Sequence, residues 1–233
     1  MTESENIDDI VRRLCTKEAP LGERLAEFSA VVREREPPFA DAYDDLAKRL
    51  ASANAFSGAP DAGDFMPPFA LPDSRLKIHR LDEMLRNGPV VMSFNRGHWC
   101  PYCMVELNAL KQGLKRIAAA GAQVVSIMPD MQEYIAKVAS GIDDAFLILS
   151  DENNGYALSL DLVMWLGERI KALENAIEFR LETSQHNGAW FVPIPATFVV
   201  ATNGEVIARF IDPDFRKRME IDDIIAALRR ASI

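Results

Sequence analysis

The sequence predicts an α/β fold in which a mixed β-sheet is flanked by helices, with a helical extension at the N-terminus. From about residue 76, short apolar runs typical of buried strands alternate with segments of helical periodicity. Two late strand-like runs are separated by Thr202-Asn203-Gly204-Glu205, a turn signal for an antiparallel hairpin. A helix-like segment follows the hairpin. Strands that alternate with helices pair in parallel, so an added hairpin makes the sheet mixed.

The individual elements follow from the same periodicities. We expect strands over residues 76–79, 90–94, 123–128, 146–149, 196–200 and 206–211, and helices over residues 81–86, 100–120, 131–140, 154–179 and 220–230. The longest of the later helices rests on apolar residues from Leu162 to Phe179, with a break at Gly167, and a polar loop over 183–188 follows it. This region either caps a functional site, closes the core or contacts a partner subunit.

Residues 1–56 predict a helical N-terminal extension that carries no chemistry of its own. Three segments repeat apolar residues at helical spacing, for example Leu21, Leu25, Phe28 and Val32 in the second. A loop over residues 57–72, rich in proline and glycine, separates them from a second domain over residues 60–233. The apolar faces must be covered. They pack either on the chain's own domain or across a homodimer.

Composition and charge limit the kinds of partner and the cellular compartment that fit this chain. The chain has 233 residues, 48% of them hydrophobic, which is enough for a packed core. Its 35 acidic and 26 basic residues give a net charge of −9, which disfavours nucleic acid and anionic membranes as partners. The acidic, polar start does not resemble a secretory signal. We therefore expect a cytoplasmic protein with reduced cysteines.

The most informative motif is Cys100-Pro101-Tyr102-Cys103, which follows an apolar strand and opens a helix. A helix N-terminus favours negative charge and so lowers the pKa of a thiol, which predicts Cys100 as the nucleophile. Cys103 lies one turn further on and is the natural resolving partner. The alternatives are half of a zinc site or an inert buried pair. The chain has only three cysteines and three histidines, and Cys15 lies far upstream in a helical stretch, so redox use is favoured.

Four neighbours of the dithiol are candidates for supporting roles. Trp99 would exclude water from the site, or simply pack in the core. His98 and Arg96 could each favour the Cys100 thiolate by positive charge, the alternatives being an exposed histidine and a surface ion pair. Pro101 fits the first turn of a helix, where its missing N–H is no loss.

The sequence resembles the AhpC/TSA family, which includes the peroxiredoxins, over roughly residues 60–230. The segments that carry the resemblance are GDFMPPFALPD at 63–73, FLILSD at 146–151 and PIPAT at 193–197. More narrowly, FNRGHWCPYC at 94–103 resembles a peroxiredoxin-like subgroup with a Trp-Cys-Pro-x-Cys centre. The resemblance implies a thioredoxin-like fold.

The resemblance also implies an activity, that of a thiol peroxidase. Cys100 would attack a hydroperoxide or a disulfide, and Cys103 would complete a disulfide that a thioredoxin-like or glutathione-dependent reductant reopens. No metal or organic cofactor is required. Pro195 resembles the cis-proline of thioredoxin-fold proteins, so we expect a cis Ile194–Pro195 bond, with the backbone of Ile194 lining the substrate groove.

The centre departs from the peroxiredoxin pattern at two positions. The family usually has proline seven residues and threonine or serine three residues before its reactive cysteine, whereas this chain has Ser93 and Gly97. The Cys-Pro-Tyr-Cys centre is similar to that of many glutaredoxins. Hydroperoxide reduction is the favoured function. A disulfide oxidoreductase and a redox-sensing binding module remain as alternatives.

Overall fold

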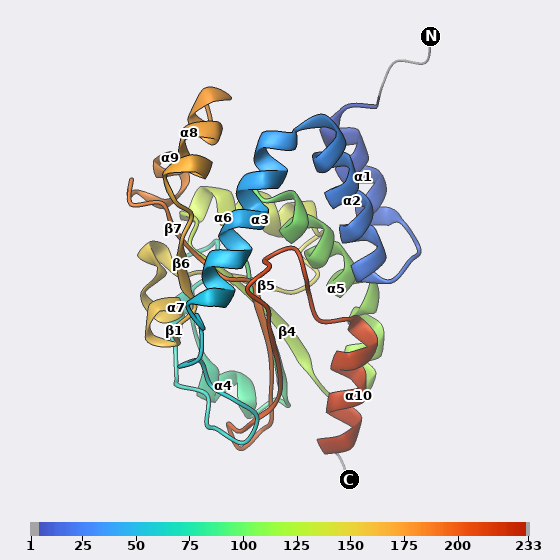
Figure 1. The fold of residues 1–233 in the computed structure, drawn as a ribbon. Coiled ribbons are helices and arrows are strands. Elements are labelled where there is room, and N and C mark those ends of the chain that lie inside the picture. The colour runs from blue at the N-terminus through green and yellow to red at the C-terminus, as the bar shows by residue number, and fades with distance from the viewer. Residues whose placement is uncertain (1–4, 232–233) are drawn as a thin grey trace.

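The computed structural model describes residues 5–231 and is built on a five-stranded mixed sheet (Figure 1). The strand order is β5-β4-β3-β8-β9, in which β3, β4 and β5 are parallel and β8 and β9 are antiparallel to their neighbours. The strands are β3 (Val90–Phe94), β4 (Gln123–Met128), β5 (Leu147–Ser150), β8 (Ala196–Val200) and β9 (Val206–Ile211). The predicted α/β class and the mixed sheet are confirmed.

The alternation of side chains along the strands assigns a cover to each face of the sheet. Val91, Val124 and Val199 point to one face, which is covered by α5 (Pro101–Ala119) and α10 (Ile221–Ala231), with α6 (Gln132–Gly141) packed beside β5. Met92 and Phe198 point to the other face, which is covered by the chain after Phe56 together with α4 (Leu81–Leu85) and α7 (Gly155–Ser159).

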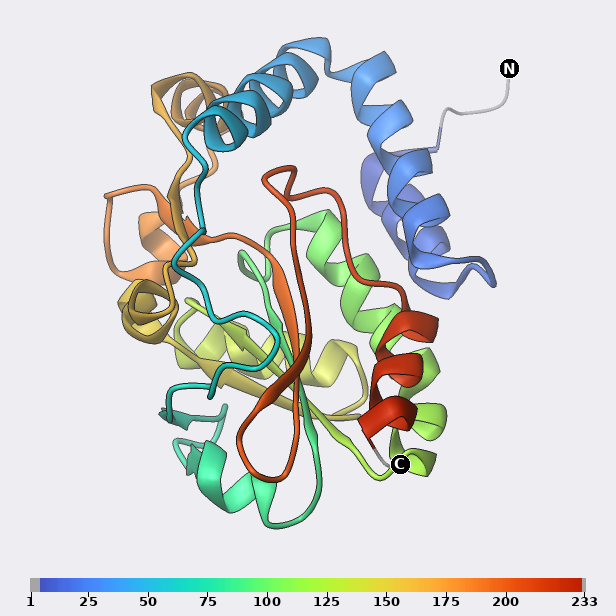
Figure 2. The same cartoon turned by 60° about the horizontal axis from the view of Figure 1, so that its bottom comes forward.

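The N-terminal extension forms the three predicted helices, α1 (Ile7–Thr16), α2 (Leu21–Arg35) and α3 (Pro37–Ser52). The Asn6 side chain caps α1 by accepting a hydrogen bond from Asp9 N at 2.8 Å. The Glu220 carboxylate, just before α10, accepts bonds from the first two N–H groups of α2. α1 and α2 pack on α5, and α3 packs on α8 (Glu168–Ala176). Figure 2 shows the three helices, in blue, arching over one end of the sheet.

The predicted helix over 154–179 is wrong. The chain forms the short helices η1 (Glu152–Asn154) and α7, then the strand β6 (Val163–Trp165), and only then α8. Asp161 and Gly167 have positive φ values of 54° and 93°; Asp161 lies between α7 and β6, and Gly167 between β6 and α8. β6 pairs with β7 (Phe191–Pro193), so a strand partner remote in sequence outweighs the helical spacing of the apolar residues. Within the predicted polar loop, α9 (Glu182–Gln185) makes one short turn.

Two smaller expectations are also corrected. The strand predicted over 76–79 lies at β2 (Ile78–Arg80) and pairs with β1 (Ala70–Pro72), a segment predicted to be loop. The Ile194–Pro195 bond is trans, since no cis peptide occurs in residues 5–231. Ile194 N donates to Leu162 O at 2.7 Å, and this bond continues the β6–β7 ribbon to the start of β8 with the chain extended. No helix among the described residues is long and apolar enough to cross a membrane.

Candidate active site

The dithiol lies at the start of α5, immediately after β3 and its connecting loop. Cys100 is the N-cap residue and Pro101 the first helical residue, as the motif predicts. The backbone oxygen of Cys100 accepts bonds from Cys103 N at 3.0 Å and Met104 N at 3.1 Å. Both cysteines are free thiols with 0% exposure. The site is therefore a buried dithiol, and a reagent reaches its sulfur atoms only after local opening.

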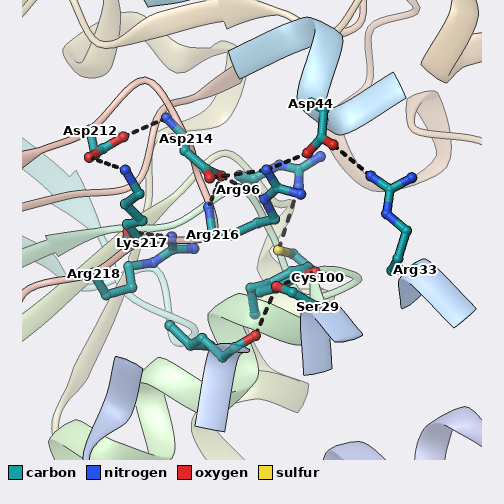
Figure 3. A network of polar contacts seen from close by, with 12 residues as sticks. Ser29, Arg33, Asp44, Arg96, Cys100, Asp212, Asp214, Arg216, Lys217 and Arg218 are labelled. Atoms are coloured by element: carbon teal, nitrogen blue, oxygen red, sulfur yellow. Dashed lines mark hydrogen bonds and ion pairs between the residues drawn. The ribbon is translucent and has the colours of Figure 1, made fainter. Parts of the chain in front are cut away.

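Each thiol of the pair has its own guanidinium. Arg96 Nη1 donates to Cys100 Sγ at 3.9 Å, and Arg218 Nη2 donates to Cys103 Sγ at 3.7 Å (Figure 3 shows the first contact). Arg96 and Arg218 are 1% and 6% exposed. Two buried cations beside two thiols make this part of the protein a site for thiolate charge.

The pKa values of the two thiols diverge in this environment. Burial alone raises the pKa of Cys100, but the hydrogen bond with Cys103 and the charges of Arg96 and Arg218 outweigh it, and the result is a pKa of about 6. The pKa of Cys103 is raised well above its ordinary value by burial and by its hydrogen bond to Cys100. At neutral pH Cys100 is the thiolate and Cys103 the thiol, which is the assignment the sequence predicted.

Arg96 is held by aromatic rings rather than by a carboxylate. Its guanidinium carbon lies 4.1 Å from the ring centroid of Phe215, 4.7 Å from that of Trp99 and 6.0 Å from that of Tyr43. Its Nε and Nη2 atoms are buried without a hydrogen-bond partner. The candidate role of Arg96 beside Cys100 thus gains a geometry, with two nitrogen atoms, Nε and Nη2, left over to donate to a ligand.

Arg218 is anchored by a buried carboxylate. Arg218 Nε lies 2.6 Å from Glu106 Oε2, and Ser93 Oγ donates to Glu106 Oε1 at 3.0 Å. Glu106 is on α5, one turn after Cys103, and is 2% exposed. The ion pair thus fixes the guanidinium beside Cys103 and ties the segment before α10 to the active helix.

The structure does not bring His98 to the dithiol. His98 N donates to Asp130 Oδ2 at 2.6 Å, its Nδ1 lies 3.2 Å from Asp130 Oδ1, and its ring stacks on Tyr134. Gly97 just before it has a φ of 141°, and a Cβ there would lie 2.5 Å from Trp99 Nε1. The bend at Gly97 turns His98 toward α6 and Trp99 toward Arg96.

A cavity of about 390 Å³ borders the residues on either side of Cys100. Its walls come from α1, α2, α3, the α5 N-terminus and the α8 region, and are mostly apolar or aromatic: Ile7, Phe28, Val32, Phe39, Tyr43, Trp99, Pro101, Tyr102, Ile177 and Phe179. Its charged lining residues are Glu36, Arg96 and Glu174. The N-terminal extension and the insertion after β6 thus complete the site.

Ion pairs fasten the N-terminal helices to the turn that carries Phe215 and Arg218. The Asp44 carboxylate, on α3, lies 2.7 Å from Arg216 and 2.6 Å from Arg33, and Arg216 Nε also pairs with Asp214 at 2.7 Å (Figure 3). Figure 3 shows Asp44 between the guanidinium groups of Arg33 and Arg216. The turn over 212–218 therefore brings Phe215 and Arg218 to the site and is tied to α3.

Four further site residues escaped the sequence analysis: Glu106, Glu174, Phe215 and Arg218. Glu106 had a local signal, since a carboxylate three residues after Cys103 lies on the same face of the helix. The other three come from segments distant in sequence. Neither spacing nor composition could place them. Groups of three or more potential metal ligands do not occur among the residues that the structure describes.

Comparisons with known proteins bear on the family and the fold of the chain. The sequence profile of the AhpC/TSA family matches residues 62–209. No curated protein sequence matches the chain significantly.

Solved structures with a similar fold include the peroxidoxin BcpB of Mycobacterium tuberculosis, with 24% identity and a TM-score of 0.57 over 73% of this chain and 97% of that one. A cysteine variant of peroxiredoxin 6 from Arenicola marina has 14% identity and a TM-score of 0.57, covering 73% of each chain. The reduced 2-Cys peroxiredoxin of Plasmodium vivax has 13% identity and a TM-score of 0.54, covering 73% of this chain and 81% of that one. The chain therefore belongs to the AhpC/TSA family, with the thioredoxin-like fold of the peroxiredoxins and the enzyme class of a thiol peroxidase.

Proposed function

We propose that the protein reduces hydroperoxides through a Cys100/Cys103 dithiol–disulfide cycle. The observation that carries the proposal is the contact of Cys100, whose pKa is about 6, with Arg96, whose other two nitrogens, Nε and Nη2, are buried and unpaired. A hydroperoxide oxygen is a hydrogen-bond acceptor that those donors would bind. The family usually has a threonine or serine hydroxyl three residues before the reactive cysteine, and this chain has Gly97 there. Arg96 therefore takes over the polarisation of the O–O bond.

The first step transfers two electrons from sulfur to the peroxide. The Cys100 thiolate attacks one peroxide oxygen, the S–O bond forms, the O–O bond breaks and an alkoxide or hydroxide departs. Cys100 becomes a sulfenic acid. Cys103 then attacks that sulfur, a disulfide forms and water leaves, with the Cys103 proton going to the departing hydroxide. Arg218, at 3.7 Å, stabilises the Cys103 thiolate in this step.

The remaining features of the cycle follow from the chemistry of a disulfide. A thioredoxin-like or glutathione-dependent reductant would reopen the Cys100–Cys103 bond, which requires the first turn of α5 to become exposed.

We place the protein in the cytoplasm, where such reductants keep thiols reduced. We also propose a homodimer. Sedimentation velocity would refute it by finding a species of 26.0 kDa at micromolar concentration.

A disulfide oxidoreductase is the second candidate, favoured by the loss of the family hydroxyl at Gly97. Both thiols are 0% exposed, so a protein disulfide would reach them only after the first turn of α5 opens, as the reductant of the peroxidase cycle also must. A redox-sensing module would oxidise and reduce the dithiol reversibly, without rapid catalytic turnover of a substrate.

A substrate comparison separates these candidates. Reduced protein is mixed with equimolar hydrogen peroxide, tert-butyl hydroperoxide or oxidised glutathione, and thiol loss is followed with time. We expect rapid loss with a hydroperoxide that Cys100→Ser abolishes, and slow loss with the disulfide. The reverse order of rates would transfer the assignment to disulfide exchange.

A further inference from the structure

The cavity beside the dithiol contains two buried side chains of opposite charge that do not form an ion pair. Arg96 and Glu174 both line it and are 1% and 7% exposed. Among the described residues no nitrogen of Arg96 lies within 4.0 Å of a carboxylate oxygen. The Nε and Nη2 atoms of Arg96 are buried without a hydrogen-bond partner, so this cavity is bordered by a guanidinium with unused donors and by a carboxyl group.

The charges of Cys100, Arg96 and Glu174 influence one another. One buried guanidinium is neutralised by one anion, and in the resting enzyme the Cys100 thiolate at 3.9 Å supplies it. Burial raises the pKa of Glu174 to about 7, with Arg96 opposing and the Cys100 charge adding to the rise. When the thiolate becomes a neutral sulfenic acid, Arg96 loses its anion and the carboxylate form of Glu174 becomes favourable.

We propose that Glu174 is the catalytic proton donor to the departing oxygen of the hydroperoxide. This inference rests on the proposed function. The Cys100 thiolate forms the S–O bond, the O–O bond breaks, and the alkoxide takes its proton from the carboxylic acid of Glu174, which yields an alcohol, a sulfenic acid and a carboxylate. The net charge of the three groups, Cys100, Glu174 and Arg96, is zero before and after the step. Solvent reprotonates Glu174 between turnovers.

The other groups that face Glu174 do not supply this proton. Burial raises the pKa of Tyr43 far above neutrality, and Glu36 lies exposed at the mouth of the cavity. The remaining walls are mostly apolar or aromatic side chains, which carry no acidic group that could protonate an alkoxide near neutral pH. General acid catalysis of this kind contributes about 10²- to 10⁴-fold.

The leaving group provides the sharpest test. tert-Butyl hydroperoxide releases a strongly basic alkoxide, whereas peracetic acid releases acetate, which is stable without a proton. For Glu174→Gln near neutral pH we expect the rate constant with tert-butyl hydroperoxide to fall by about 10²-fold and that with peracetic acid to stay nearly unchanged. Glu168→Gln removes a carboxylate from an exposed position on the same helix and should leave both rates as in the wild type.

Two other results with Glu174→Gln would contradict a role as proton donor. If Glu174 only competes with the thiolate for Arg96, its neutralisation lowers the pKa of Cys100, and Glu174→Gln would react with both reagents as fast as the wild type or faster. A uniform loss with both reagents would indicate a distorted site. Either result overturns the proposal.

A pH profile gives a second readout with tert-butyl hydroperoxide. In the wild type the rate should rise as Cys100 ionises around pH 6 and fall as Glu174 ionises around pH 7. The fall should be absent in Glu174→Gln. If the wild type does not react with any hydroperoxide, the proposed function fails; if it reacts and Glu174→Gln keeps the fall, only the role of Glu174 fails.

Discussion

The reactivity of Cys100 is decided by groups that lie within a few ångströms of its sulfur. Full burial opposes ionisation, so the thiolate exists only because Cys103 and two guanidiniums stabilise it. Arg96 contacts the sulfur directly and is itself held between aromatic rings. Because the ring faces carry no net charge, Arg96 keeps its positive charge available for the thiolate and for a substrate.

Removal of Arg96 should raise the pKa of Cys100. In the wild type, alkylation of Cys100 by uncharged iodoacetamide should increase with a midpoint near pH 6, because the thiolate prevails above its folded pKa. In Arg96→Met the midpoint should move upward and the rate at neutral pH should fall. Arg12→Met, at an exposed position far from the site, serves as the control. An unchanged midpoint in Arg96→Met would show that Arg96 does not stabilise the thiolate.

The absent hydroxyl at position 97 cannot be restored by mutation. Gly97 has a φ of 141°, and a Cβ there would lie 2.5 Å from Trp99 Nε1 and 3.1 Å from Asp130 Oδ1. We expect Gly97→Thr to lower the free energy of unfolding by about 1–3 kcal/mol or more and to slow the peroxide reaction. Gly63→Ala, also at positive φ but with nothing within 4 Å, isolates the backbone strain in the same urea titration. A stable and faster Gly97→Thr enzyme would contradict this geometry.

Helix α5 is linked to the end of the chain by the buried Glu106–Arg218 ion pair. Removing one partner leaves the other charge buried and unpaired, so Arg218→Met should cost about 3–5 kcal/mol of unfolding free energy. The double variant Glu106→Leu with Arg218→Met should recover most of that loss. Arg116→Met breaks the exposed pair with Asp222 and should cost about 0–1 kcal/mol. Additive losses in the double variant would refute the pairing argument.

At the scale of elements, the strands of the sheet and the helices that flank it were predictable, because the spacing of their apolar residues matches the structure that each of them forms. Residues 90–94, 123–128, 196–200 and 206–211 form strands with the predicted bounds. The region 154–179 was not predictable, since its β6 strand depends on pairing with β7 almost thirty residues later. A local pattern cannot report a partner so distant in sequence.

The active site was predictable only where its residues lie close together in the sequence. The motif and the residue before it predict Cys100, Cys103, Pro101 and Trp99, which lie within one stretch of five residues. Arg218 and Glu174 reach the site only through the packing of α10 and α8, so no sequence spacing relates them to the dithiol. The division of the chain near residue 60 stays a prediction, although the buried residues of both parts form one continuous core.

At the scale of the whole molecule, the N-terminal helices supply much of the wall of the active-site cavity. Phe28 is 2% exposed and packs edge-on against Tyr102 at a centroid distance of 4.9 Å. Phe28→Ala should lower the free energy of unfolding by about 3–5 kcal/mol and raise the exposure of the dithiol. Urea unfolding and the alkylation rate of Cys100 measure the two effects.

The control for this variant is Phe65→Ala. Phe65 is 68% exposed, so its removal should change stability by less than about 0.5 kcal/mol. If Phe28→Ala matched Phe65→Ala in both stability and alkylation rate, the helices would not contribute to the site.

The central claim is that Cys100 is oxidised by a hydroperoxide and passes to a disulfide with Cys103. The most direct measurement is stopped-flow Trp fluorescence of the fully reduced protein mixed with stoichiometric tert-butyl hydroperoxide, with the products identified by mass spectrometry. Our account predicts a reaction much faster than that of free cysteine, a Cys100–Cys103 disulfide in the wild type and a trapped Cys100 sulfenic acid in Cys103→Ser. Oxidation no faster than that of free cysteine, or equally fast in Cys100→Ser, would contradict it.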